Sequence, residues 1–128
     1  LGLGDKVLRR SWAPEGCLRG LYAESLAVAY LSEYEGFGLP ALEALACGAP
    51  VVALRRASLP EVLGEAAVWV DEATPPAVAE GLNRVVRDAC LRRDLRQAGP
   101  RRAERFSWEE MARQTLAVLR RTAGQGGA

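Results

Sequence analysis

The fold of this chain is decided by residues 26–48, which read LAVAYLSEYEGFGLPALEALACG. The run at residues 26–31 is almost continuously apolar, as is typical of a parallel β-strand that is buried on both faces. Pro40 suits the start of a helix, where a missing N–H group costs nothing, and Gly48 suits a helix end that needs a left-handed backbone. The stretch therefore predicts a buried strand, a glycine-containing loop and a helix at residues 41–47.

Short apolar runs and helical patterns alternate along the rest of the chain. Further strands are predicted at residues 50–54 and 67–70, and a weaker one at residues 6–9. The spacing of apolar residues predicts helices at residues 15–23, 58–61, 75–89, 91–98 and 107–122. We expect Gly99 and Pro100 to interrupt the helical pattern after residue 98. Strands that alternate with helices predict an α/β fold, here a Rossmann-like parallel sheet with flanking helices.

The composition is that of an ordinary soluble globular protein. The chain has 128 residues, which is one domain or less, and 49% of them are hydrophobic, which is enough for a core. The formal net charge is +1, without the strong basic excess of a dedicated nucleic-acid binder, so we expect no nucleic-acid partner. No apolar run approaches the length of a membrane span. We expect a cytoplasmic protein, with peripheral attachment at the inner face of the membrane left open.

The reactive side chains narrow the chemistry further. The sequence contains no histidine, which excludes Ser/His and Cys/His nucleophilic systems and His-ligated metals from this segment. Cys17, Cys47 and Cys90 lie far apart and in no paired motif, so we expect reduced thiols rather than a disulfide or a zinc site. Chemistry carried out by these residues must therefore use carboxylates, backbone amides or arginines.

The loop between the predicted strand and helix carries the candidate chemistry. In open α/β sheets, ligands bind beyond the carboxyl ends of the strands. Gly36 and Gly38 let the backbone approach a ligand closely and adopt positive φ angles. The start of the helix adds free N–H groups and the positive end of the helix dipole. Together these features predict an anion site that is suited to phosphate.

Glu35 and Glu43 lie on either side of this loop. Glu35 directly precedes the glycines, and Glu43 lies at the edge of the apolar face of the helix, where it can point into a crevice. A diphosphate between two hydroxyl-bearing sugars matches this pattern, because amides bind phosphates and carboxylates accept hydrogen bonds from sugar hydroxyls. The glycine pattern alone is weak evidence, and Glu43 could equally be a carboxylate that stabilises the helix dipole.

The string EGFGLPALE at residues 35–43 resembles the hallmark of the retaining glycosyltransferase family 4, the glycosyl transferases group 1, which have the GT-B fold. Residues 21–22, 26–32, 46–53, 59–62, 66–67 and 106–108 resemble the same family in order and spacing. The resemblance covers nearly the whole chain, from about residue 4 to residue 119. One departure is Leu31, where the family often has a proline.

This resemblance implies a role for each site residue. Glu35 corresponds to the glutamate that contacts the hydroxyls of the donor sugar, and it is the candidate catalytic residue. Glu43 corresponds to the glutamate that binds the ribose of the nucleotide. The residues whose backbone amides would meet the sugar and the phosphates are Gly36, Phe37, Gly38 and Leu39. Such enzymes transfer a sugar from a nucleoside diphosphate sugar with retention at the anomeric carbon. We therefore expect part of a hexosyltransferase that needs no metal or other cofactor.

The resemblance also implies partners that the chain does not contain. Family members place the active site between two Rossmann-like domains, and this chain corresponds to the C-terminal, donor-binding one. Because the chain begins with Leu1, we expect a fragment that lacks the N-terminal Rossmann-like domain and the first strands of its own domain. Those strands normally bring a basic Arg/Lys pair for the diphosphate, so the isolated chain should be inactive. The acceptor is left open between a sugar, a lipid-linked glycan and a small molecule.

The extent of the domain follows from the same reasoning. We assign residues 1–122 to one incomplete domain and residues 123–128 to a flexible tail. If the complete sheet has the doubly wound strand order 3-2-1-4-5-6, two strands are missing between residues 6–9 and residues 26–31. We therefore expect a sheet with a gap at that point, or a non-native closure.

Two alternatives to an enzyme of this family are considered. A non-catalytic Rossmann-like module for nucleotide binding or protein interaction would be free to lose Glu35 or Glu43, and both are present. A dinucleotide-dependent oxidoreductase is disfavoured, because the loop lacks the third glycine and the acidic residue that follows about 20 positions later in such enzymes. Arg55 and Arg56 are either two solvated arginines or contacts for an anionic donor or acceptor.

Overall fold

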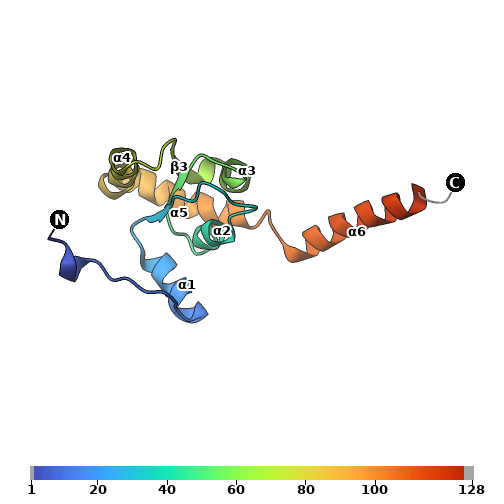
Figure 1. Ribbon diagram of the computed structural model, residues 1–128, viewed down its shortest axis with the longest axis horizontal. Coiled ribbons are helices and arrows are strands. Elements are labelled where there is room, and N and C mark those ends of the chain that lie inside the picture. Colours follow the sequence, from blue (N-terminus) through green and yellow to red (C-terminus); the bar gives the residue numbers. More distant parts are fainter. Residues whose placement is uncertain (1, 126–128) are drawn as a thin grey trace.

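The computed structural model describes residues 2–125 and contains a three-stranded parallel sheet (Figure 1). The strands are β1 (Val28–Tyr30), β2 (Val51–Leu54) and β3 (Ala67–Val70), and β2 lies between the other two. Val51 of β2 is in register with Val28 of β1 and with Ala67 of β3. These pairings confirm the predicted parallel sheet and give the last two strands very nearly the predicted bounds.

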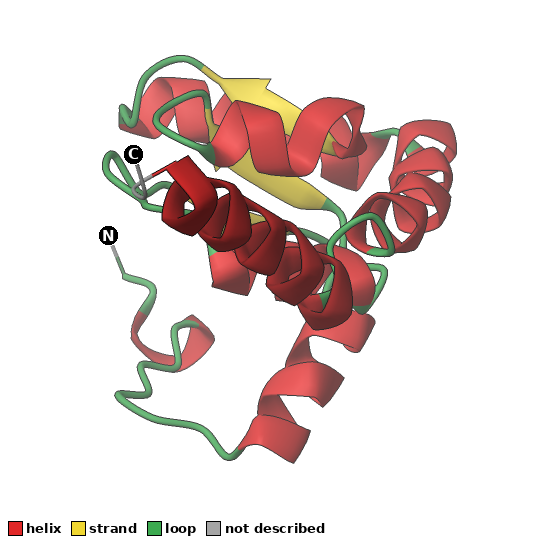
Figure 2. Cartoon of the chain, turned by 90° about the vertical axis from the view of Figure 1, so that its right-hand side faces the viewer, coloured by secondary structure: helices red, strands yellow, loops and turns green. Residues whose placement is uncertain are grey.

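Helices follow each strand and surround the sheet (Figure 2). The two short 3-10 helices are η1 (Gly4–Lys6) and η2 (Gly64–Ala66). The α-helices are α1 (Glu15–Glu24), α2 (Leu39–Ala46), α3 (Leu59–Leu63), α4 (Pro75–Arg87), α5 (Ala89–Ala103) and α6 (Trp108–Gln125). Among these described helices, none is long and apolar enough to cross a membrane.

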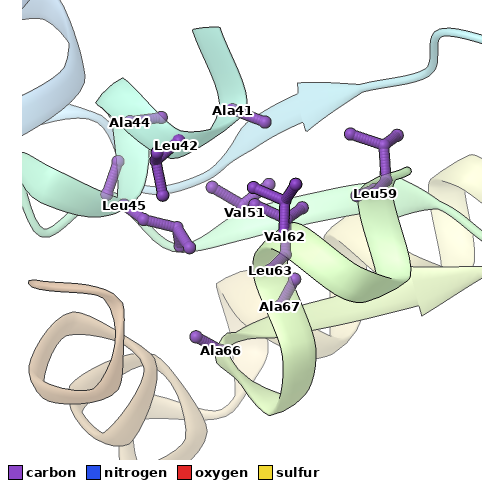
Figure 3. Close-up of a cluster of buried hydrophobic side chains, with 12 residues drawn as sticks. Ala41, Leu42, Ala44, Leu45, Val51, Leu59, Val62, Leu63, Ala66 and Ala67 are labelled. Carbon is purple, nitrogen blue, oxygen red and sulfur yellow. The ribbon is translucent and has the colours of Figure 1, made fainter. Parts of the chain in front are cut away.

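Strand β2 is buried along its whole length and divides the core into two clusters. Val51 and Ala53 face the cluster that α2 and α3 cover, and Figure 3 shows the leucines and alanines of these helices over the sheet. Val52 and Leu54 face the second cluster, to which α4 contributes Val85. Both faces of β2 are therefore packed, as expected for a parallel strand in an α/β fold. The strand predicted at residues 26–31 is shorter and less buried than expected, because β1 lies at the edge of the sheet, covers three residues and has Ala29 exposed, while Leu26 is 57% exposed.

Two close approaches of helix backbones depend on glycines. A Cβ atom on Gly81 of α4 would lie 2.8 Å from Val70 and 2.9 Å from Val52, so α4 rests directly on the sheet at this point. A Cβ atom on Gly99 of α5 would lie 2.9 Å from the backbone oxygen of Leu45 in α2. Helix α5 therefore packs against α2 at a distance that no other residue type allows without movement.

The predicted interruption at Gly99 and Pro100 is wrong, because α5 runs without a break from residue 89 to residue 103. Proline cannot donate the backbone hydrogen bond at its position, which ordinarily disfavours the interior of a helix. Here the close packing of Gly99 on Leu45 and the burial of Leu95 hold the helix together. Tertiary packing therefore overrides the local preference.

The predicted strand at residues 6–9 is also wrong. Gly4–Lys6 form η1 and the next residues are irregular, with Val7 64% and Leu8 77% exposed. A strand needs a neighbour to satisfy its backbone hydrogen bonds, and β1 pairs only with β2 in the described sheet. Within residues 2–125, the sheet therefore shows neither the expected gap between residues 6–9 and residues 26–31 nor a non-native closure at that point.

Helix α6 extends away from the rest of the molecule (Figure 1). It includes residues 123–125, which lie in the segment that was predicted as a flexible tail. The remaining part of that prediction, residues 126–128, lies outside the described residues.

The contact between α5 and α2 predicts a large effect for Gly99→Ala. The added methyl group meets the backbone of Leu45, so we expect the free energy of unfolding to fall by about 1–3 kcal/mol, although alanine favours a helix. Gly20→Ala in α1 is the matched control, because no atom lies within 4 Å of its Cβ position and stability should stay equal or rise. Urea denaturation of both variants makes the measurement, and a Gly99→Ala protein as stable as Gly20→Ala would contradict this packing.

Candidate functional site

The loop from β1 to α2 places the predicted site at the carboxyl edge of the sheet. Gly38 is buried and has a φ of 90°, in the left-handed region, and its carbonyl accepts the first backbone hydrogen bonds of α2. A Cβ atom on Gly38 would lie 2.6 Å from the Leu59 side chain of α3, so only glycine fits here. The prediction of a positive φ is confirmed for Gly38 only, since Gly36 is not among the residues with positive φ and has open space around it.

Glu35 is held at two points. The Tyr30 hydroxyl at the end of β1 donates a hydrogen bond to Glu35 Oε1 at 2.6 Å. The Ser58 hydroxyl, at the start of α3, donates a hydrogen bond to the Glu35 backbone oxygen at 3.1 Å. The side chain of Glu35 is thereby tied to the last residue of β1, and its backbone is tied to the start of α3.

Sequence reasoning did not single out Tyr30 or Ser58. Tyr30 looked like one more apolar residue of a buried strand, and the signal that could have revealed it is a hydroxyl at the end of that strand, five residues before Glu35. Ser58 lies 23 residues from Glu35, and no local pattern relates the two.

Tyr30 is held in its protonated form. Burial, which has the largest effect, together with the hydrogen bond to Glu35 and the negative charge of Glu35, raises the pKa of Tyr30 from its ordinary value of 10 to about 12. A smaller contribution to the Tyr30 pKa comes from the neighbouring Tyr22. The Tyr30 hydroxyl therefore keeps its proton and can donate a hydrogen bond to the Glu35 carboxylate throughout the neutral pH range.

Glu43 lies on the solvent side of α2, while its neighbours Leu42 and Ala44 are buried. Within residues 2–125, it forms no salt bridge. Burial raises the pKa of Tyr22 in α1, and the charge of Glu43 raises it further. The Glu43 carboxylate is therefore free to accept hydrogen bonds from a ligand.

The aromatic ring of Phe37 supports the loop from the side. It meets the Phe106 ring edge to face, with 5.6 Å between the ring centroids and an interplanar angle of 84°. The Arg102 guanidinium lies 5.2 Å from the Phe106 centroid and donates hydrogen bonds to the Val62 and Glu61 carbonyl oxygens. The corner between α5 and α6 is thereby linked to α3 and to the loop. Leu39, the remaining predicted loop residue, is exposed at the start of α2.

The two arginines after β2 differ in their surroundings. Arg55 forms a salt bridge with Asp71 at 3.3 Å and lies 5.0 Å from the centre of the Trp69 ring. Arg56 is exposed, and it is followed by Ala57, the one residue other than glycine with positive φ among residues 2–125. Arg55 is therefore engaged by its neighbours, and the strained turn at Ala57 presents Ser58 to Glu35.

Two surface hollows lie elsewhere on the molecule. One, of about 730 Å³, lies where α4 meets α5 and is lined by polar residues such as Arg84 and Asp88. The other, of about 330 Å³, lies between α1 and the end of α2, beside Cys47. Neither is lined by residues 35–43, and within residues 2–125 no three side chains converge as metal ligands. Residues 35–43 lie instead on the loop after β1 and on the first half of α2, at the carboxyl edge of the sheet.

Several known proteins are similar to this chain in sequence or structure. The alignment with the O-antigen chain mannosyltransferase B of Escherichia coli is 39% identical and covers 89% of this chain and 32% of that protein. The alignment with the MMP alpha-(1->4)-mannosyltransferase of Mycolicibacterium hassiacum is 41% identical and covers 92% of this chain and 30% of that protein. The chain thus spans about a third of the length of these relatives.

A solved structure and a family model agree with these relatives. The sucrose-phosphate synthase of Thermosynechococcus elongatus superimposes with a TM-score of 0.84 and 30% identity, over 96% of this chain and 32% of that chain. This likeness confirms the predicted fold class. Residues 1–102 match the family model described as Glycosyl transferases group 1. The chain belongs to the glycosyl transferases group 1 family.

Proposed function

We propose that this chain is the C-terminal, donor-binding portion of a retaining GT-B glycosyltransferase of family 4, of the hexosyltransferase type. Its donor is a nucleoside diphosphate sugar. The observation that carries the proposal is the loop at residues 35–38, which the left-handed backbone of Gly38 joins to the start of α2. Such a start presents free N–H groups and a positive dipole end to an anion at the carboxyl edge of the sheet.

Each site residue has a distinct part in donor binding. The backbone amides of the loop and of the first turn of α2 bind the diphosphate. Glu35 accepts hydrogen bonds from the sugar hydroxyls, and Glu43, which forms no salt bridge within residues 2–125, accepts those of the ribose. A carboxylate has enough lone pairs to accept two sugar hydroxyls at once. The residues that would provide the amides are Gly36, Phe37, Gly38 and Leu39.

The proposed reaction replaces one bond at the anomeric carbon of the sugar. The bond to the diphosphate oxygen breaks, and the acceptor hydroxyl oxygen forms a new bond on the same face of the ring. The nucleoside diphosphate leaves with the electron pair of the broken bond, and its departing oxygen takes up the proton that the acceptor hydroxyl loses. Amides and a helix N-terminus stabilise the negative charge that develops on the leaving group, so no metal or other cofactor is proposed.

The proposed site is completed by parts that these residues do not provide. An N-terminal Rossmann-like domain would bind the acceptor, which is a sugar, a lipid-linked glycan or a small molecule. The same domain would cover the open edge of the sheet. A basic pair upstream would share the charge of the diphosphate. Residues 1–122 then belong to one incomplete domain, which is inactive without these parts. We place the enzyme in the cytoplasm or at the inner face of the membrane.

The test uses the intact enzyme that contains these residues and measures sugar transfer from a set of nucleoside diphosphate sugars. Mannose donors come first, because two of the relatives are named mannosyltransferases. Glu43→Ala removes the proposed ribose ligand, so we expect KM for the donor to rise on the order of tenfold to a hundredfold, as for a lost hydrogen bond to a charged group.

The control for this test is Glu80→Ala, which removes an exposed carboxylate from α4 and should leave KM unchanged. If Glu43→Ala and Glu80→Ala had the same KM as the unmodified enzyme, the ribose role of Glu43 would be rejected. If the intact enzyme bound nucleoside diphosphate sugars without transferring the sugar, the chain would belong to a binding module instead.

A further inference from the structure

Glu35 needs external support to hold a fixed direction. It lies in the irregular loop between β1 and α2, directly before Gly36. No atom lies within 4 Å of the position that a Cβ atom on Gly36 would take. A carboxylate that accepts hydrogen bonds from particular sugar hydroxyls must keep its orientation, because a small misplacement of such a group costs much of its effect. The support must therefore come from a neighbouring rigid element.

Tyr30 provides such support from the sheet. It is the last residue of β1, is in register with Ala53 of β2, and packs against the core cluster below α2 and α3. The distance of 2.6 Å from its hydroxyl to Glu35 Oε1 is within the range for a short hydrogen bond from a hydroxyl to a carboxylate. The Ser58 hydroxyl holds the backbone oxygen of the same residue. Glu35 is therefore fixed both at its main chain and at its carboxylate.

The geometry leaves part of the carboxylate available. Tyr30 has one hydroxyl hydrogen, and the contact is to Oε1 only. Glu35 Oε2 and the remaining lone pairs of Oε1 can therefore accept hydrogen bonds from a ligand. Tyr30 itself does not need to touch that ligand.

We infer that Tyr30 is the positioning residue of Glu35, and that through it the site distinguishes a nucleoside diphosphate sugar from the free nucleoside diphosphate. This inference rests on the proposed function, in which Glu35 faces the sugar and Glu43 faces the ribose. The sugar is the only part of the donor that Glu35 would contact. Loss of the Tyr30 hydroxyl should therefore weaken recognition of the sugar and leave recognition of the nucleotide intact.

The protonation of Tyr30 supports the role. Burial, the hydrogen bond to Glu35 and its charge raise the pKa of Tyr30 to about 12, with a smaller effect of Tyr22. The hydroxyl thus remains a donor at every pH at which the enzyme would work.

The first experiment measures the contact without any ligand. The pKa of Tyr30 is followed by NMR in the chain labelled with ¹³C at the tyrosine Cζ atoms, with assignments from tyrosine variants. We expect Tyr30 to titrate near 12, and Glu35→Gln to lower the Tyr30 pKa in part, because the charge and the strong acceptor are lost while the larger effect of burial remains. The control is Glu33→Gln, an exposed carboxylate of the same loop, which should leave the Tyr30 pKa unchanged. An equal Tyr30 pKa in both variants would overturn the contact.

The second experiment compares Tyr30→Phe with Tyr34→Phe in the intact enzyme. Both variants lose one hydroxyl, but Tyr34 is 90% exposed in the same loop and does not contact the Glu35 carboxylate. For Tyr30→Phe we expect Kd for the nucleoside diphosphate to stay within about twofold, while kcat/KM for the sugar donor falls about tenfold. Equal losses for both ligands would indicate a merely structural role, and no loss for either would also overturn the inference.

The outcomes separate this inference from the proposed function. If Glu35→Gln lowers the pKa of Tyr30 but the intact enzyme binds no nucleoside diphosphate sugar, the proposed function is rejected although the contact exists. The enzyme could also bind the donor and transfer the sugar while Tyr30→Phe leaves both Kd for the nucleoside diphosphate and kcat/KM for the sugar donor unchanged. In that case only the positioning role of Tyr30 is rejected.

Discussion

The burial of β2 on both faces is the constraint on which the rest of the structure depends. All four of its residues are buried, and its alternating side chains need apolar cover on two sides. Helices α2 and α3 provide the cover on one side and α4 on the other. Because the three strands are parallel, the segments that leave them all emerge at one edge of the sheet. The position of the glycine loop at that edge is therefore a consequence of how the core is packed.

The site is built from contacts that converge on this loop from different parts of the fold. Gly38 adopts the backbone conformation that starts α2 against Leu59, and Phe37 rests on Phe106 at the corner between α5 and α6. Tyr30 and Ser58 fix Glu35 from the ends of two strands. A loop with two glycines would be mobile on its own, and these contacts give it the preorganisation that favours ligand binding.

The sequence predicted those features that short-range patterns determine. The predicted bounds of β3 were correct because a short apolar run is visible within a few residues. The positive φ predicted for Gly38 was correct because the turn before α2 is a local feature. The prediction of a strand at residues 6–9 was wrong because a strand needs a neighbouring strand to pair with. The prediction of a helix break at Gly99 was wrong because packing against α2 holds α5 in place. The contact of Ser58 with Glu35 could not be predicted, since Ser58 lies 23 residues away and is brought to Glu35 only by the pairing of β1 with β2.

The central claim is that residues 35–43 bind the diphosphate and the sugar of a nucleotide donor. A crystal structure of the intact enzyme with a bound nucleoside diphosphate sugar tests it most directly. The account predicts diphosphate oxygens within hydrogen-bond distance of the backbone amides at the start of α2, with Glu35 against the sugar and Glu43 against the ribose. A donor bound in the hollow between α4 and α5, or anywhere without contact to residues 35–43, would contradict it.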